Sequence, residues 1–177
     1  MSLTIRPLTP VFGAEIQGVD LAAGVDDASF AEIDRAFEDY SILLFRNQAL
    51  DDEAQVAFGH RFGDLEKTHA HVANGHRNSF ISEISNLDPE GKLMTAEDPR
   101  VKFRIGQRRW HSDSSFKSPP AKASLLHARI LPEDGGRTEF ASLRAAYDAL
   151  SDADKAKYEG MVAVHHYTYS RRGTDLE

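Results

Sequence analysis

The residues of this sequence best suited to chemistry are His111 and Asp113, within residues 110–116 (WHSDSSF). In an extended strand the side chains alternate between two faces, so residues two apart point the same way. An imidazole and a carboxylate on one face are two of the three ligands in the two-histidine, one-carboxylate iron site of non-haem oxygenases. The segment therefore predicts a strand that carries two metal ligands.

The same residues also have a purely structural interpretation. With 8 His and 16 Asp among 177 residues, about 0.7 His-x-Asp matches are expected by chance. Asp113 could cap a turn together with Ser114 and Ser115, and His111 could be an ordinary sheet histidine. The pair alone does not decide between the two interpretations.

The surrounding sequence favours the metal site, because motifs of a known family occur in order along nearly the whole chain. They lie at residues 13–16, 18–21, 43–46, 62–63, 110–116, 119–121, 135–140 and 145–150, and around His165. With these motifs the chain resembles the taurine/2,4-dichlorophenoxyacetate dioxygenase family. The sequence at residues 110–116, at residues 84–86 and at Gly91-Lys92 is more similar to the phenoxyacetate branch than to the taurine branch.

The resemblance implies an enzyme that depends on Fe(II), on 2-oxoglutarate as cosubstrate and on O2. By position, His111 and Asp113 would be two of the iron ligands. Thr138 stands where the family uses a hydroxyl to bond the cosubstrate carboxylate. The residues implied to contact substrate are Lys92, His69 and Thr68.

One part of the family pattern is not found in the sequence. The family's third iron ligand is a His on a late strand, followed by an Arg whose planar fork matches the far carboxylate of 2-oxoglutarate. The sequence stops at Glu177, and the His and Arg residues between positions 165 and 172 come too early for these roles. We therefore expect residues 1–177 to form a single dioxygenase domain that lacks its C-terminal part, and to bind iron weakly at best.

The implied function is hydroxylation of a small carboxylate-bearing substrate such as an aryloxyalkanoate, with release of succinate and CO2. One alternative is a taurine-type sulfonate dioxygenase of the same family, and another is a non-catalytic fragment without the distal His and Arg. A zinc hydrolase that uses His69, His71 and His111 with Asp113 is a weaker hypothesis, because the sequence has no His-Glu-x-x-His helix motif.

Composition describes an ordinary globular protein, with 41% hydrophobic and 28% charged residues. The net charge of −7 argues against a nucleic-acid partner, because phosphate binding needs a basic surface. No apolar run has the length of a membrane span, and no secretory leader is recognised at the start. The absence of Cys leaves only His and carboxylates as metal ligands. We expect a cytoplasmic protein, a homo-oligomer, that acts on small molecules.

Hydrophobic patterning predicts a mixed α/β fold. Strands are expected twice within residues 3–21 and at 41–46, 80–85, 110–116, 124–130, Thr138 and 161–164. Helices are expected at 28–39, capped by Asp26 or Asp27, at 51–62, opened by Asp51 or Asp52, and over 142–158, where a second helix is expected to begin at Ser151. Residues 64–79, rich in His, and the locally basic residues 86–109 predict loops, the latter a possible lid over the site. We expect a double-stranded β-helix (jelly roll) with the helices outside, incomplete in this chain.

Overall fold

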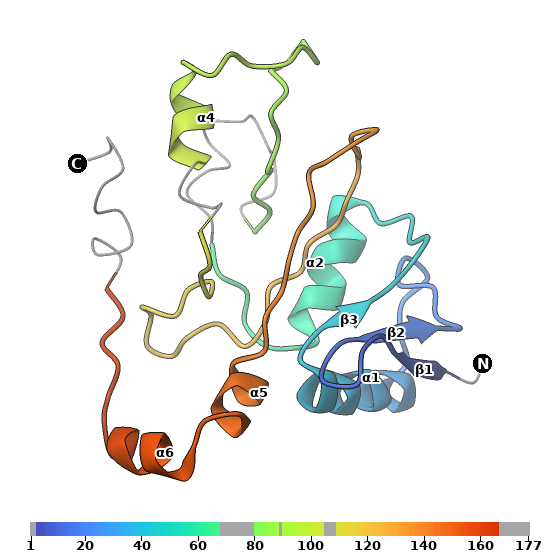
Figure 1. Cartoon of the computed structure of the whole chain (residues 1–177). Coiled ribbons are helices and arrows are strands. Elements are labelled where there is room, and N and C mark those ends of the chain that lie inside the picture. The colour runs from blue at the N-terminus through green and yellow to red at the C-terminus, as the bar shows by residue number, and fades with distance from the viewer. Residues whose placement is uncertain (1–2, 68–79, 89, 105–108, 167–177) are drawn as a thin grey trace. The chain divides into compact units, whose positions relative to one another are not determined.

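A computed structural model describes residues 3–67, 80–88, 90–104 and 109–166 of the chain (Figure 1). The chain separates into two compact units. The first contains residues 1–65 and 125–161, and the second contains residues 66–124 and 162–177. Each unit is described by itself, and the expectation of a single domain stays a prediction.

The first unit contains a small three-stranded sheet. Strand β1 (Thr4–Pro7) pairs antiparallel with β2 (Ala14–Gln17), so that Ile5 lies opposite Ile16. Strand β3 (Leu43–Leu44) pairs parallel with β2, and β2 is the central strand (Figure 1). The three predicted strands are confirmed, but β3 is two residues long and only half-buried, whereas its apolar run predicted burial on both faces.

Two capped helices accompany this sheet, as predicted. Helix α1 (Asp27–Tyr40) begins where the Asp26 carboxylate accepts a 2.8 Å hydrogen bond from the amide of Ser29. Helix α2 (Asp52–His60) begins in the same way at Asp51. An aspartate at this position satisfies an amide that has no partner inside the helix, which explains where both helices start.

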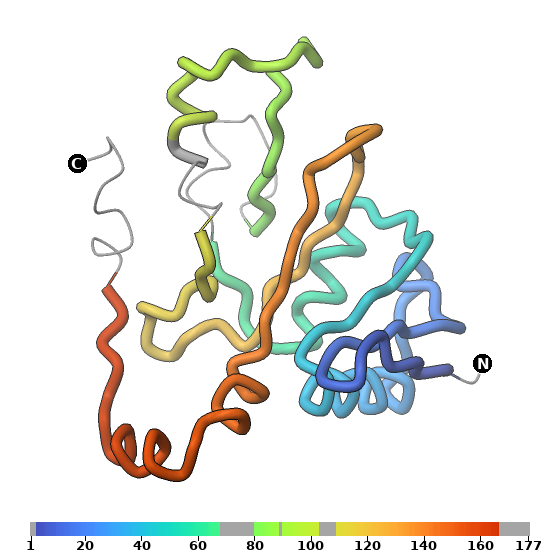
Figure 2. Tube along the Cα trace, in the orientation of Figure 1, coloured from blue at the N-terminus to red at the C-terminus, as the bar shows by residue number. Residues whose placement is uncertain are grey.

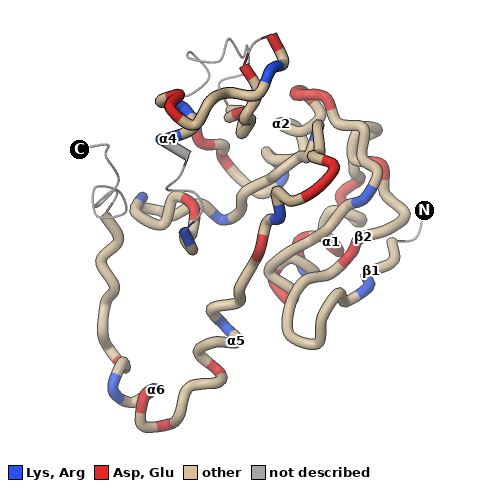
Figure 3. The backbone as a smooth tube through the Cα atoms, turned by 45° about the horizontal axis from the view of Figure 1, so that its top comes forward, with Lys and Arg blue, Asp and Glu red and all other residues tan. Residues whose placement is uncertain are grey.

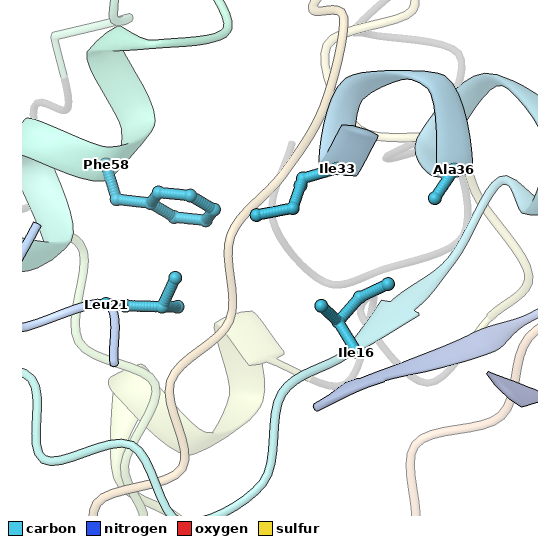
Figure 4. Close-up of a cluster of buried hydrophobic side chains, with 5 residues drawn as sticks. All are labelled: Ile16, Leu21, Ile33, Ala36 and Phe58. Carbon is cyan, nitrogen blue, oxygen red and sulfur yellow. The ribbon is translucent and has the colours of Figure 1, made fainter. Parts of the chain in front are cut away.

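The core of the first unit lies between these helices and β2 (Figure 4). Its buried apolar side chains are Ile16, Leu21, Ile33, Ala36 and Phe58. Around them, aromatic rings meet edge to face, with the rings of Phe30 and Phe62 centred 4.9 Å apart. Such pairs add to the free energy gained by burying apolar surface, so this half of the first unit has a well-packed interior.

The remaining helices are short. Residues 142–158 form two helices, α5 (Leu143–Asp148) and α6 (Asp152–Tyr158), each capped by the serine before it, which confirms the second helix start predicted at Ser151. Helix α4 (Pro99–Arg104) of the second unit was not predicted. An Asp followed by Pro is a helix-start signal, and the Asp98 carboxylate does accept a hydrogen bond from the amide of Arg100.

The other predicted strands are wrong for the described chain. Residues 80–85, 110–116, 124–130, 138 and 161–164 are irregular or form turns (Figure 1, Figure 2). A strand needs a neighbouring strand to bond its amides and carbonyls, and in the described residues outside β1–β3 there is one isolated bridge, between Leu87 and Leu93. Apolar side chains of these segments are therefore exposed, including Trp110 at 70% and Val164 at 87%.

Charge is mixed along the described parts of the chain, where Lys and Arg are interspersed among Asp and Glu (Figure 3). Within the described residues, no helix has the length and apolar character needed to cross a membrane.

Candidate metal centre

His111 and Asp113 face each other in the second unit, although they are not on a strand. Residues 109–112 have no regular secondary structure, and residues 113–116 form a turn. Nε2 of His111 lies 3.2 Å from Oδ1 of Asp113, and the two side chains are 48% and 58% exposed. The two donor atoms are thus next to each other and accessible from solvent.

The other polar atoms of both side chains have partners. Nδ1 of His111 lies 2.7 Å from the backbone carbonyl of Arg109, and the hydroxyl of Ser124 donates a 2.8 Å hydrogen bond to Oδ2 of Asp113. A histidine whose Nδ1–H is donated to a carbonyl keeps Nε2 for its other partner, which is a metal in metal-binding histidines and the Asp113 carboxylate, 3.2 Å away, in this structure. These bonds hold the two side chains with Nε2 and Oδ1 next to each other.

The spacing of the pair fits a divalent metal. Two adjacent ligands of an octahedral cation with bonds of about 2.1 Å have their donor atoms about 3.0 Å apart, close to the observed 3.2 Å. The pair supplies two ligands, and within the described residues no group of three or more His, Cys, Asp or Glu is arranged to hold a metal. The donor set therefore fits part of an iron site, and its assignment as metal ligands stays a prediction.

The serines after Asp113 bond to residues far from them in the sequence. The hydroxyl of Ser114 donates to Oε2 of Glu66 at 2.8 Å, and the hydroxyl of Ser115 lies 2.8 Å from Nδ1 of His165. Asp113 bonds to Ser124 rather than capping a turn with its neighbours, and no strand surrounds His111. Glu66, Ser124 and His165 were not predicted as partners of this segment, because no local spacing indicates contacts between residues this far apart.

Glu66 is tied to the turn that follows the pair. Its Oε2 atom also accepts a 2.6 Å hydrogen bond from Nζ of Lys117. This bond to Lys117 holds the pKa of the Glu66 carboxyl below its ordinary value, helped by Ser114 and opposed by partial desolvation. Glu66 is thus an anion at neutral pH.

Of the other predicted site residues, the structure describes Lys92 in the second unit and Thr138 in the first. Lys92 is exposed in a loop of the second unit, where its amide donates to the Asp88 carboxylate at 2.8 Å. Thr138 is exposed on an irregular segment of the first unit. Thr68, His69 and the zinc candidate His71 lie outside the described residues.

Comparison with known proteins identifies the family to which the chain belongs. The sequence model described as "Taurine catabolism dioxygenase TauD, TfdA family" matches residues 4–176. The chain belongs to this family, which confirms the resemblance found in the sequence.

Curated relatives and a solved structure narrow the comparison. The chain is 37% identical over 175 residues to an alpha-ketoglutarate-dependent 2,4-dichlorophenoxyacetate dioxygenase of Cupriavidus pinatubonensis, covering 97% of the chain and 61% of the relative. It is 39% identical to an (S)-phenoxypropionate/alpha-ketoglutarate-dioxygenase of Sphingobium herbicidovorans, covering 96% and 56%. A crystal structure of AAD-2 in complex with Mn(II) and N-oxalylglycine matches with a TM-score of 0.85 and 38% identity, covering 97% and 58%. The chain thus spans about 60% of the length of these relatives.

Proposed function

We propose that this chain belongs to an Fe(II)- and 2-oxoglutarate-dependent dioxygenase that acts on a small carboxylate-bearing substrate such as an aryloxyalkanoate. The observation that carries the proposal is the facing pair of Nε2 of His111 and Oδ1 of Asp113, 3.2 Å apart, in a chain that matches the family over residues 4–176. Both curated relatives described above act on phenoxyalkanoates by name, which favours this substrate class over sulfonates.

In this proposal the chain's residues position the reactants. His111 and Asp113 hold the metal, oriented by the carbonyl of Arg109 and the hydroxyl of Ser124. Thr138 bonds a carboxylate of 2-oxoglutarate. With iron and 2-oxoglutarate bound, the chemistry supplied is hydroxylation by O2 with release of succinate and CO2. A phenoxyacetate hydroxylated beside its ether oxygen would collapse to a phenol and glyoxylate.

Recognition of the substrate carboxylate is assigned to the loop before the metal pair. Lys92 is exposed at the end of a turn that the Asp88 side chain closes through the amides of Glu90 and Lys92. Its ammonium is a compact charge on a flexible stem and suits pairing with a carboxylate. Thr68 and His69 are proposed to border the same substrate. The proposal also includes completion of a jelly roll by further strands, a homo-oligomeric state and a cytoplasmic location.

A substrate panel tests the proposal. The protein at the full length of its relatives is supplied with Fe(II), 2-oxoglutarate and O2, and succinate is measured with aryloxyalkanoates, taurine or other sulfonates. We expect succinate with aryloxyalkanoates and none above background in His111→Ala. Turnover of taurine but of no aryloxyalkanoate would overturn the substrate class, and substrate-dependent succinate that persists in His111→Ala would overturn the site.

A further inference from the structure

The turn after the metal pair has an unfavourable backbone conformation held by side chains. Ser114, directly after Asp113, has a φ of 50°, in the left-handed region that costs a residue with a Cβ free energy. The amide of Lys117 closes the turn by donating to the carbonyl of Ser114 at 3.0 Å. The conformation of Ser114 therefore sets the direction in which the chain continues after Asp113.

The carboxylate of Glu66 accepts hydrogen bonds from both ends of this turn. Oε2 of Glu66 accepts from the hydroxyl of Ser114 at 2.8 Å and from Nζ of Lys117 at 2.6 Å. Glu66 is 48 positions before Ser114 in the chain, so this contact is tertiary. It fixes the first and last residues of the turn to one point.

We propose that Glu66 is a positioning residue for the metal pair. By holding Ser114 and Lys117 it keeps the turn after Asp113 closed, and so keeps Oδ1 of Asp113 next to Nε2 of His111. The inference rests on the metal-binding role of His111 and Asp113 in the proposed function. Glu66 makes no described contact with either ligand and acts through the backbone of Ser114.

Glycine at position 114 separates this role from simpler ones. Glycine adopts a positive φ without cost, so Ser114→Gly keeps the turn closed without help from Glu66. If Glu66 acted only as a nearby negative charge that attracts cations, Ser114→Gly would not compensate for its loss. Rescue in the double variant Glu66→Ala/Ser114→Gly is therefore specific to positioning through the turn.

The first readout needs no metal. Hydrogen exchange of the Lys117 amide, followed by NMR in the 177-residue chain, reports opening of the turn. Because both Glu66 and Lys117 are partly exposed, at 39% and 42%, we expect Glu66→Ala to speed this exchange by about two- to fivefold. The double variant should return to the original rate, and Glu97→Ala, which removes an exposed carboxylate near α4, should leave it unchanged.

The second readout is Mn(II) affinity, measured by EPR of free Mn(II) in titrations that reach the millimolar range. We expect Glu66→Ala to weaken binding by about two- to fivefold and the double variant to restore it, with thermal unfolding midpoints showing that each variant is folded. Should Glu66→Ala not fold, Lys117→Met removes one of the two bonds and is expected to give the same direction in both readouts.

The outcomes separate this inference from the function on which it rests. Unchanged Lys117 exchange and unchanged Mn(II) affinity in Glu66→Ala, or failure of Ser114→Gly to rescue, would overturn the positioning role and leave the metal pair intact. In the protein at the full length of its relatives, equal Mn(II) binding with and without His111→Ala would overturn the metal pair itself, and the positioning role with it.

Discussion

The hydroxyl of Ser124 provides the most direct test of how the metal pair is oriented. It donates a 2.8 Å hydrogen bond to Oδ2 of Asp113, whereas the other oxygen of this carboxylate, Oδ1, is the one 3.2 Å from His111. Ser124→Ala removes this bond while leaving both proposed ligands in place. We therefore expect weaker metal binding without loss of the fold.

The size of the effect follows from the exposure of the carboxylate. A hydrogen bond to a charged group contributes about 1.5–3 kcal/mol in favourable settings, but Asp113 is 58% exposed and water can replace the hydroxyl. We therefore expect the bond from Ser124 to contribute about 0.5–1 kcal/mol to the free energy of metal binding. Its removal then corresponds to a loss of about two- to fivefold in affinity.

Mn(II) titration by EPR measures this loss in the 177-residue chain. Ser118→Ala, which removes another exposed hydroxyl of the same unit, is the matched control and should bind like the unsubstituted chain. His111→Ala sets the level without the pair. If Ser124→Ala and Ser118→Ala bound Mn(II) equally well, the bond to Asp113 would have no orienting role and the reasoning would be refuted.

Three further predictions concern the enzyme and the fold. His111→Ala and Asp113→Ala should each abolish succinate release in the protein at the length of its relatives, because each removes a ligand; near-normal release from either contradicts the assignment. Thr138→Val should raise the KM for 2-oxoglutarate and Lys92→Ala the KM for substrate, each largely without the other, in steady-state kinetics. Ile33→Ala should destabilise the first unit by about 2–5 kcal/mol in urea unfolding, since Ile33 is 0% exposed; a change below 1 kcal/mol would mean that the core relaxes around the cavity.

Signals in the local sequence were sufficient to predict the helices of the first unit that pack on its sheet. Aspartates before apolar, helically spaced residues predicted α1 and α2, and Asp26 and Asp51 are their caps in the structure. The helix at Pro99 was missed although the same kind of signal, Asp98 before a proline, was present. The polar and basic residues around this signal favoured a loop over residues 86–109.

Strand predictions failed where pairing was needed. Residues 124–130 have the alternation of a strand, yet they are irregular in the structure, and Leu126 and Ile130 are 65% and 77% exposed. A helix bonds within itself, whereas a strand depends on a partner elsewhere in the chain. The pattern in one segment therefore cannot establish that its partner is there.

The sequence by itself determined the family, the types of the two proposed ligands and their spacing of two residues. The tertiary structure decided how that spacing is used: His111 and Asp113 lie face to face where the chain enters a turn, rather than side by side on a strand. It also decided which residues hold them, because Glu66 and Ser124 reach the segment only through folding. Residue type and local spacing are properties of the chain, whereas contacts between distant residues form only when tertiary packing offsets the entropy of closing the loop between them.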